Sequence, residues 1–346
     1  MQQTQRLNFK TLWLSDIHLG SRWSAAINHT NRLLQFVKAD TLYLVGDVID
    51  GRDLARVPYW PHAHEEALQR LMHAPHDNSH VVMLAGNHDI GLRRTLVEAG
   101  VAIGDVQRHL PLGKNGQVDP RLDRPAVHLQ QRALFYNHEG AHIVMHGDEG
   151  EVFSPHASRL LPVYDFFYYG LSLISPTYNR LAAPLAGKYT PLTRAFQNLV
   201  CTKLDFVTSF EQRVAKQAAE LGMRGVFAGH VHYPADKMID GVHYRNSGSL
   251  QADVTCLAET FDGRIQLLDW GSISHQLTGS LPHDASVLDA AAATLGAERL
   301  TTPTSFVYQP TATSRHARLV PSTCAHLIAS ATYGPGPRRY PVPLVG

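Results

Sequence analysis

Five short segments of the sequence place carboxylate, amide and imidazole side chains directly after apolar runs. The segments read SDIH, GD, GNHD, MHGD and GHVH, and their donor residues are Asp16, His18, Asp47, Asn87, His146, His230 and His232. In SDIH and GHVH the two donors are two residues apart, so in an extended chain they point the same way and can serve one cluster. Oxygen and nitrogen donors without thiolate suit Mn²⁺, Fe²⁺ or Zn²⁺, and the number of imidazoles disfavours a site for Mg²⁺ alone.

Seven candidate ligands are too many for one ion but enough for two, provided that one carboxylate bridges the ions. Two ions roughly 3.5 to 4 Å apart can activate a water and clamp the oxygens of a phosphoryl group during in-line attack. That chemistry needs an acid for the leaving group. His88 lies between the predicted ligand Asn87 and the carboxylate of Asp89, so this imidazole could supply the proton or stabilise the transition state. We therefore predict catalytic roles for His88 and Asp89.

The apolar runs before these segments are typical of strands. Residues 11–16 and 41–47 are short and partly alternating, and residues 27–39 between them have apolar side chains at helical spacing. The same alternation of helix and strand is repeated between residues 67 and 100. It predicts an α/β sheet flanked by helices. In open sheets of this class ligands bind beyond the carboxyl ends of the strands, so the five donor-bearing ends should meet in one place.

The later part of the chain changes character. Asp-Gly pairs at 240–241 and 262–263 lie between extended segments, which predicts two hairpins and antiparallel strands at the end of the core. Residues 152–222 show no strand pattern, and we interpret them as an inserted helical cap with amphipathic helices. One helical stripe in this cap comprises Leu160, Val163, Tyr164, Phe167, Leu171 and Ile174. Residues 271–346 are rich in Ser, Thr, Ala and Pro, which predicts a low-complexity, disordered tail apart from a helix at 285–296.

Each motif also has an ordinary structural interpretation. A single Asp-x-His or Gly-Asp at a strand end is usually a turn or a helix cap, and GNHD alone could be a type I turn. The chain has 21 histidines, so an accidental set of histidine motifs is the alternative to a metal site. We favour the site for two metal ions because the whole ordered set follows apolar strands.

Composition limits the classes of function. The 346 residues carry a formal net charge of +1, which gives no electrostatic case for binding a nucleic acid. Cys201, Cys256 and Cys324 are widely spaced, so the sequence predicts neither a disulfide framework nor a thiolate zinc site and fits a reducing cytoplasm. There is no signal-peptide pattern and no apolar stretch long enough to span a bilayer. We therefore expect a cytoplasmic protein.

At these residues the chain resembles the calcineurin-like metallophosphoesterases, whose signature has Asp-x-His, Gly-Asp, Gly-Asn-His-Asp or -Glu, His and Gly-His-x-His in this order. The match covers residues 8–270, which we take as the catalytic domain with the cap inserted in it. The resemblance implies an α/β fold, a four-layer αββα sandwich, and two ions bridged by Asp47. The implied ligands are Asp16, His18, Asp47 and His232 for one ion, and Asp47, Asn87, His146 and His230 for the other.

Within this superfamily the chain is most similar to the UDP-2,3-diacylglucosamine diphosphatases of lipid A biosynthesis. The similarity rests on HGD at 146–148, the helical insert before GHVH, and Pro234 soon after it. Members of that group hydrolyse a diphosphate link by water attack, releasing UMP and an acylated sugar phosphate, and their insert receives acyl chains. Their well-characterised members have Arg where this chain has His88. The His form also fits phosphomonoesterases and phosphodiesterases at large.

Two further features bear on the substrate. Arg93 and Arg94 follow GNHD and could contact phosphate, although exposed arginines on a helix face are common. The aromatic run at 166–169 could line a groove for lipid tails, and through the cap the protein could contact the inner membrane peripherally. The same pattern is also typical of helices that pack on the core or on a second subunit.

The sequence therefore predicts a Mn²⁺-dependent hydrolase of a phosphoester or diphosphate, with Fe²⁺ or Zn²⁺ as alternative metals. The partner would be a phosphorylated small molecule or lipid, with no nucleic acid expected. A phosphodiesterase or nuclease is one rival, but the chain has no long Lys/Arg stripe to neutralise a nucleic-acid backbone. A non-catalytic metal-binding scaffold is the second rival, and the complete donor set together with His88 argues against it.

Overall fold

The computed structural model describes both sheets of the protein and parts of the remaining chain. The described residues are 3–24, 27–74, 79–89, 91, 127–149, 166–168, 170–175, 177–182, 192–196, 206–251, 254–273 and 285–303. Several parts of the sequence prediction lie outside these ranges. They are Arg93 and Arg94, the helix predicted at the end of the 67–100 region, residues 304–346, and Leu160, Val163 and Tyr164 of the predicted stripe.

The first sheet contains the N-terminal strands. Its strand order is β11-β10-β1-β2-β3-β4, and β12 also pairs with β1. Each of β1 to β4 runs parallel to its neighbours in that series, whereas β10, β11 and β12 pair antiparallel. The carboxyl ends of β1, β2 and β3 therefore lie at the same edge. The bounds are β1 Gln3–Leu14, β2 Val37–Val45, β3 His80–Leu84, β4 Val127–Gln130, β10 Thr255–Glu259, β11 Ile265–Asp269 and β12 Glu298–Pro303.

The second sheet has the order β5-β6-β7-β9-β8, in which β6, β7 and β9 are parallel. β8 and β9 form the hairpin that the sequence predicted, and its turn residues Asp240 and Gly241 both have positive φ, 47° and 82°. Two consecutive positive φ values are the mark of a type I′ turn, which explains the Asp-Gly pair. The bounds are β5 Arg132–Asn137, β6 Gly140–Met145, β7 Gly225–Ala228, β8 Ala235–Ile239 and β9 Val242–Asn246.

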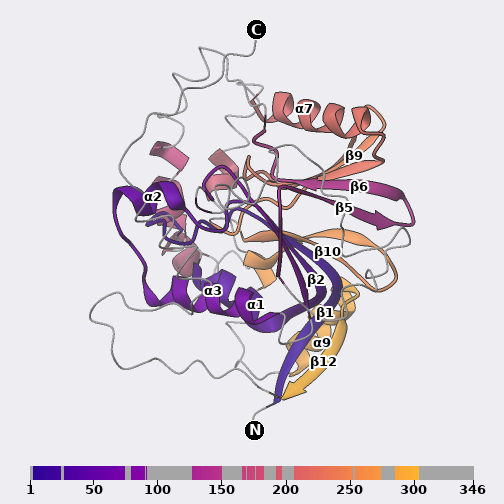
Figure 1. Ribbon diagram of the computed structural model, residues 1–346. Helices are drawn as coiled ribbons and strands as arrows, with labels where there is room; N and C mark the ends of the chain where they lie inside the picture. Colours follow the sequence, from indigo (N-terminus) through magenta and orange to yellow (C-terminus); the bar gives the residue numbers. More distant parts are fainter. Residues whose placement is uncertain are drawn as a thin grey trace.

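Helices cover the outer face of each sheet (Figure 1). Buried apolar residues of α1, α3 and α9 pack against the first sheet, and those of α7 pack against the second. The layers therefore run helix, sheet, sheet, helix, and the predicted α/β four-layer sandwich is confirmed. The helix bounds are α1 Ile27–Phe36, α2 Gly51–Arg56, α3 His62–His73, α7 Phe206–Glu220 and α9 Ala285–Leu295.

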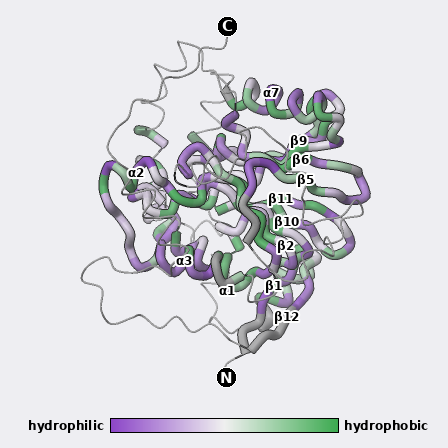
Figure 2. Tube along the Cα trace, viewed as in Figure 1, coloured by the Kyte–Doolittle hydropathy of each residue, from purple (hydrophilic) through white to green (hydrophobic). Residues whose placement is uncertain are grey.

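The core between the two sheets is built around Trp13 of β1. Its ring stacks on Tyr43 of β2, with centroids 5.8 Å apart, and on Phe227 of β7, with centroids 4.3 Å apart. Phe135 of β5 meets the same ring edge-on at 4.9 Å. Figure 2 shows hydrophobic residues concentrated in the central strands, and hydrophobic and hydrophilic residues alternating along α7. Trp13 thus joins strands of both sheets in one aromatic cluster.

We expect Trp13→Ala to lower the free energy of unfolding by about 3–5 kcal/mol, because a fully buried aromatic ring would be replaced by a cavity. Urea unfolding followed by circular dichroism measures the change. Phe261→Ala is the matched control, since that ring is 38% exposed and its loss should change stability by less than about 0.5 kcal/mol. Equal unfolding midpoints for the two variants would contradict this account of the core.

The sheet extends past the boundary that the sequence predicted at residue 270. α9 packs on the first sheet, and β12 pairs with β1 from Gln3 to Asn8. Residues 285–303 therefore form ordered structure where we expected a disordered tail, and only the helix in that region was predicted. β1 also begins at Gln3, earlier than the predicted strand at 11–16, because its N-terminal half has β12 as a partner.

The predicted cap divides into two parts. α7, which we had assigned to the cap, forms the outer layer on the second sheet. The other described residues of the insert, 166–168, 170–175, 177–182 and 192–196, are helical. Phe167 and Ile174 of the predicted stripe are 51% and 57% exposed. In the part of the chain that the structure describes, no helix has the length and hydrophobicity of a membrane span.

Candidate metal centre

The predicted donors lie in loops that begin where a strand ends. The loops follow β1, β2, β3, β6 and β7, and carry, respectively, Asp16 and His18, Asp47, Asn87 and His88, His146, and His230 and His232. Five of these residues have positive φ: Asp16 (53°), His18 (53°), Asp47 (51°), His230 (73°) and His232 (54°). A left-handed backbone is unfavourable for residues with a Cβ, and it persists where the surrounding structure enforces it, often at functional sites. The strained backbone therefore coincides with the predicted donors.

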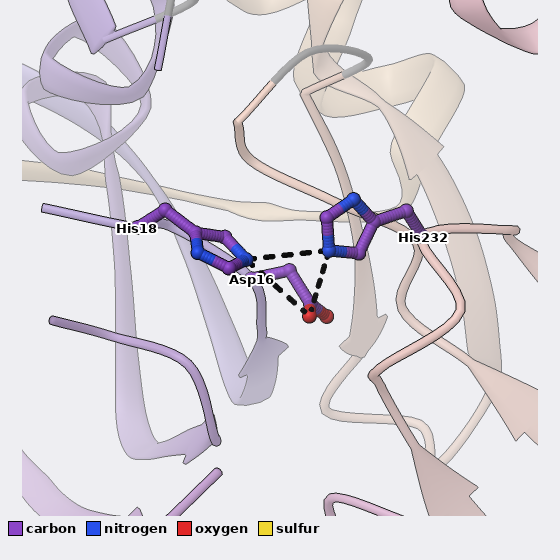
Figure 3. Close-up of side chains that lie close together, drawn as sticks. All are labelled: Asp16, His18 and His232. Atoms are coloured by element: carbon purple, nitrogen blue, oxygen red, sulfur yellow. Dashed lines mark hydrogen bonds and ion pairs between the residues drawn. The ribbon is translucent and has the colours of Figure 1, made fainter. Parts of the chain in front are cut away.

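Asp16, His18 and His232 form the first group of donors, with one ligand atom of each within 4.8 Å of the others. Figure 3 shows the three side chains pointing toward one another. Nε2 of His232 lies 3.1 Å from Oδ1 of Asp16 and 3.3 Å from Nε2 of His18. These are three of the four side chains predicted to hold one ion.

Asp47, His146 and His230 form the second group, within the same limit of 4.8 Å. Nε2 of His146 lies 3.3 Å from Oδ2 of Asp47. Asn87 joins this group, because its Oδ1 is 3.2 Å from Nε2 of His146 and 3.0 Å from Nδ1 of His230. All four side chains predicted for the other ion therefore lie together.

Asp47 lies between the two groups. The Oδ2 atom that faces His146 of the second group is also 3.8 Å from Nε2 of His18 in the first. Its other oxygen, Oδ1, accepts a hydrogen bond of 2.7 Å from the backbone N–H of His88, which fixes the carboxylate. One carboxylate oxygen thus faces an imidazole of each group, which is the arrangement that a bridging ligand requires.

The donor atoms are arranged so that they could ligate cations. Nδ1 of His146 lies 2.8 Å from the carbonyl oxygen of Val45, so Nδ1 carries a proton and Nε2 is the nitrogen that can ligate a cation. Nε2 faces the oxygens of Asn87 and Asp47, which could ligate the same cation. Oδ1 of Asp16 is fully buried and faces Nε2 of His232 at 3.1 Å. Buried carboxylate and amide oxygens that converge on imidazole nitrogens are the donor set of a metal site.

Asp50 is a functional candidate that the sequence analysis missed. Its Oδ2 lies 2.9 Å from Nδ1 of His18 and 3.0 Å from Nδ1 of His88, and these three residues form a third close group. Its Oδ1 accepts from the N–H of Asp53 and caps α2. An acidic residue just before a helix is an ordinary cap signal, which is the only sequence feature that could have drawn attention to it.

Close packing explains the glycines that precede the donors. A Cβ added at Gly46 would collide with the imidazole of His146, and a Cβ at Gly86 would collide with the carboxylate of Asp47. Gly46 also has a positive φ of 83°. The glycines of GD and GNHD are therefore required because the loops approach each other too closely for any side chain.

A model of the calcineurin-like phosphoesterase family matches residues 9–234, which is more than half of the chain. The chain belongs to this family. Together with the buried Asp and His groups, membership identifies the protein as a metal-dependent phosphoesterase, a hydrolase whose family acts on phosphoesters. The clusters are consistent with a binuclear metal site.

Solved structures similar to the phosphoesterase are distant. A conserved uncharacterised protein from Streptococcus pneumoniae, described as a predicted phosphoesterase, is 12% identical with a TM-score of 0.27, covering 79% of this chain and 92% of that chain. Yfce, a phosphoesterase from E. coli, is 12% identical with a TM-score of 0.29, covering 75% and 98%. A mutant of Vps29 from Entamoeba histolytica is 12% identical with a TM-score of 0.31, covering 75% and 96%. No curated protein matches the chain. At these scores the structures add no argument about function.

Asp89 is bonded to backbone rather than to the donor groups. Its carboxylate accepts from the N–H groups of Val48, Ile49 and Gly86, at 3.3, 2.8 and 2.9 Å. These bonds tie the GNHD turn to the loop after β2. Burial, with the charge of Asp47 adding to it, raises the pKa of Asp89 to about 6. The catalytic role of Asp89 stays a prediction.

Burial and neighbouring charges shift the pKa values of the donor residues in opposite directions. Burial raises the pKa of Asp47, but the charge and hydrogen bond of His146, with the charges of His18 and His88, hold this pKa well below its usual range. Burial likewise raises the pKa of Asp16, but His232 and His146 together lower it below its usual value. Burial lowers the pKa of His146, whereas the charge of Asp47 raises it well above its usual value. The centre therefore favours added positive charge.

Tyr168, from the insert, contacts the centre directly. Its hydroxyl lies 3.0 Å from Nδ1 of His232, the ring nitrogen turned away from Asp16, and its side chain is buried. A polar partner on the second nitrogen of a ligating histidine fixes the orientation of the ring. No sequence signal pairs the two residues, because they are 64 positions apart.

We expect Tyr168→Phe to weaken metal retention by about tenfold, because the phenyl ring fills the same space but leaves His232 without the hydroxyl. Competition with a chelator, followed by metal analysis, measures the effect. Tyr178→Phe is the matched control in the same insert, where the side chain is 42% exposed. If both variants release metal at the parent's chelator concentration, Tyr168 does not position His232.

Proposed function

We propose that this phosphoesterase binds two divalent ions and hydrolyses the diphosphate link of an acylated nucleotide sugar, as UDP-2,3-diacylglucosamine diphosphatases do. The ions would be Mn²⁺, with Fe²⁺ or Zn²⁺ as alternatives, because the donors are carboxylate, amide and imidazole. When bound, two such ions activate water and neutralise the phosphoryl oxygens during in-line displacement. The proposed ligands are Asp16, His18, Asp47 and His232 for the first ion, and Asp47, Asn87, His146 and His230 for the second.

His88 is proposed as the residue that protonates the leaving oxygen. Nδ1 of its ring is 3.0 Å from Oδ2 of Asp50, so the carboxylate holds the Nδ1 proton and leaves Nε2 to donate. Burial lowers the pKa of His88, but the hydrogen bond of Asp50 and the negative charge of Asp47 raise it above its ordinary value, against the charge of Arg52. The ring is 18% exposed, so it lies at the edge of the centre where a substrate can reach it.

The apolar surface of the insert supports the acylated substrate. Tyr168 contacts His232 of the centre, and the two residues before it, Phe166 and Phe167, are 75% and 51% exposed. Leu181, further along the insert, is 71% exposed. Exposed apolar side chains next in sequence to a residue of the metal centre could contact an alkyl chain whose phosphate lies on the ions. The exposed Phe166 and Phe167, directly before a residue that contacts His232, are the single observation that carries the proposal for the substrate.

A substrate panel tests the proposal. The Mn²⁺-loaded full chain would be assayed with an acylated UDP-sugar, the same UDP-sugar without acyl chains, a phosphomonoester, a phosphodiester and single-stranded DNA. We expect the acylated substrate to have the highest kcat/KM and to release UMP. The unacylated sugar is the matched control, since it presents the same diphosphate without the lipid.

Equal kcat/KM for the acylated and unacylated sugars would remove the lipid from the proposal. Preference for the phosphomonoester, the phosphodiester or DNA would assign another phosphoesterase activity to the same centre. The loss of acyl preference on changing Phe166 and Phe167 to Ser would tie the selectivity to the insert.

A further inference from the structure

The N-terminal half of α7, which lies on the outer face of the second sheet (Figure 1), contacts the loop that carries His146. On this helix Phe210 and Arg213 are three residues apart, so both side chains lie on the same face. Nη1 of Arg213 donates to the carbonyl oxygen of Glu149 at 2.6 Å, and Nη2 donates to the carbonyl oxygen of Gly147 at 3.1 Å. One guanidinium thus holds two carbonyl groups of the segment that directly follows His146.

The ring of Phe210 packs against His230 and lies close to the same segment. It is 2% exposed, and its centroid lies 5.6 Å from that of the His230 imidazole. A Cβ added at Gly147, whose φ is 103°, would lie 2.7 Å from this ring. The guanidinium carbon of Arg213 is 5.3 Å from the ring centroid, within the range of a cation–π contact. The glycine of HGD is therefore required because the loop approaches α7 too closely for a side chain.

The loops after β6 and β7 are also bonded to each other. The N–H of Gly229 donates to the carbonyl oxygen of His146 at 3.2 Å, and the rings of His146 and His230 lie 5.1 Å apart at an angle of 74°. The face of α7 therefore packs on a unit that contains both imidazoles proposed for the second ion. The first donor group has another support, because Tyr168 of the insert contacts His232.

The contacts of Arg213 are those of a residue that holds a loop. Its side chain is half-buried, and both of its terminal nitrogens donate to backbone carbonyl groups. The carboxylate of Glu149 is bound separately by Arg132 of β5, through Nε at 2.8 Å and also through Nη2. Glu149 thus meets one arginine with its side chain and the other with its backbone, which fixes the end of the segment 146–149.

We propose that Arg213 is a positioning residue for the second metal ion, which holds the segment after His146 on α7 while Phe210 packs behind His230. This inference rests on the proposed function, which assigns both histidines to that ion. Ordering a loop when an ion binds costs conformational entropy, so ligands on a loop that is already fixed bind the ion more tightly. The effect of Arg213 should therefore fall on one ion of the two.

Binding of Mn²⁺ to the full chain tests the inference without turnover. Metal-free parent, Arg213→Met and Arg213→Lys would be titrated with Mn²⁺ by calorimetry, and electron paramagnetic resonance would follow the coupled signal of an ion pair. Methionine keeps an unbranched side chain without the donors, whereas lysine keeps the charge without the planar fork that spans two carbonyl groups. Lys216→Met is the matched control, because Lys216 is a cation of the same helix and its side chain is 78% exposed. Circular dichroism of every sample checks the fold.

We expect the parent and Lys216→Met to bind two ions alike, and Arg213→Met to bind one of the two about 10- to 100-fold more weakly. The coupled signal of Arg213→Met should be lost at limiting Mn²⁺ and return at excess Mn²⁺, with Arg213→Lys intermediate. Its kcat should recover over the same range of metal concentration, because the donors and His88 are unchanged.

Two ions held by Arg213→Met with parental affinity would overturn the role of Arg213. Equal weakening of both ions, or a coupled signal that excess Mn²⁺ does not restore, would also overturn it, since either result means general damage to the centre. A parent that binds fewer than two ions would overturn the proposed ligand set and this inference with it. Failure of the proposed substrate shows differently, as a parent that holds two ions and hydrolyses no acylated UDP-sugar.

Discussion

Asp47→Ala is expected to remove both the bound metal and the activity of the phosphoesterase. Oδ2 of Asp47 faces His146 at 3.3 Å and His18 at 3.8 Å, so its loss deprives both donor groups of their shared carboxylate. Metal ions of this kind contribute several kcal/mol to stabilising the transition state, so kcat/KM should fall by roughly 10³-fold or more. Metal analysis of the purified protein and kinetics with the best substrate of the panel measure the two losses.

The control comes from the strand that precedes Asp47. Asp40 lies on β2 and is exposed, so Asp40→Asn removes a carboxylate from the same strand without touching the centre. It should retain parental metal content and kcat/KM. We also expect Asp47→Ala to keep the parent's circular dichroism, because the core between the sheets does not include this side chain. An Asp47→Ala protein that still holds two ions per chain would contradict the proposal that Asp47 bridges the two ions.

The convergence of the donors could be predicted because it depends on local patterns. Each donor follows an apolar run, and the carboxyl ends of β1, β2 and β3 must meet since the strands are parallel. The same holds for β6 and β7, which bring His146 and the GHVH segment to the centre. The strained backbone at Asp16 and Asp47 could not be predicted, because aspartate with positive φ reflects the tertiary contacts that hold the loop.

Residues that support the donors were missed for a different reason. Asp50 and Tyr168 have no spacing or periodicity that marks them, and their roles come from what they touch in space. Asp50 has the sequence signature of an ordinary helix cap. Tyr168 reaches His232 only because the insert packs beside the centre. Such contacts depend on tertiary packing, which a single sequence does not contain.

The strand β12 also could not be predicted from the sequence, because its formation depends on a tertiary partner. Its sequence, ERLTTP, is polar, and it pairs with the N-terminal half of β1, where Gln3, Thr4 and Gln5 are also polar. Neither segment alternates apolar and polar residues clearly enough to predict a strand. Backbone hydrogen bonding between them makes the strand pair, and that pairing leaves no hydrophobic pattern in the sequence.

His88→Ala is expected to lower kcat by about 10²- to 10⁴-fold while metal content stays at the parental level. The imidazole contacts Asp50, but it is not among the side chains proposed as ligands, so its removal leaves both donor groups complete. Steady-state kinetics and metal analysis of the same preparation measure the two quantities. His138→Ala is the control, because His138 is an exposed histidine at the turn between β5 and β6. Parental kcat in His88→Ala would refute a catalytic role.

The leaving group separates the two roles that the sequence left open for His88. A proton donor matters most when the departing oxygen is strongly basic, so the loss in His88→Ala should be much larger for an alkyl phosphate than for p-nitrophenyl phosphate. A residue that only stabilises charge on the phosphoryl oxygens would lower both rates by the same factor. Asp50 favours the first role, because its contact with Nδ1 orients the ring and leaves Nε2 as the nitrogen that can donate a proton. A loss that is independent of the leaving group would therefore leave His88 as an electrostatic residue and assign protonation to another donor.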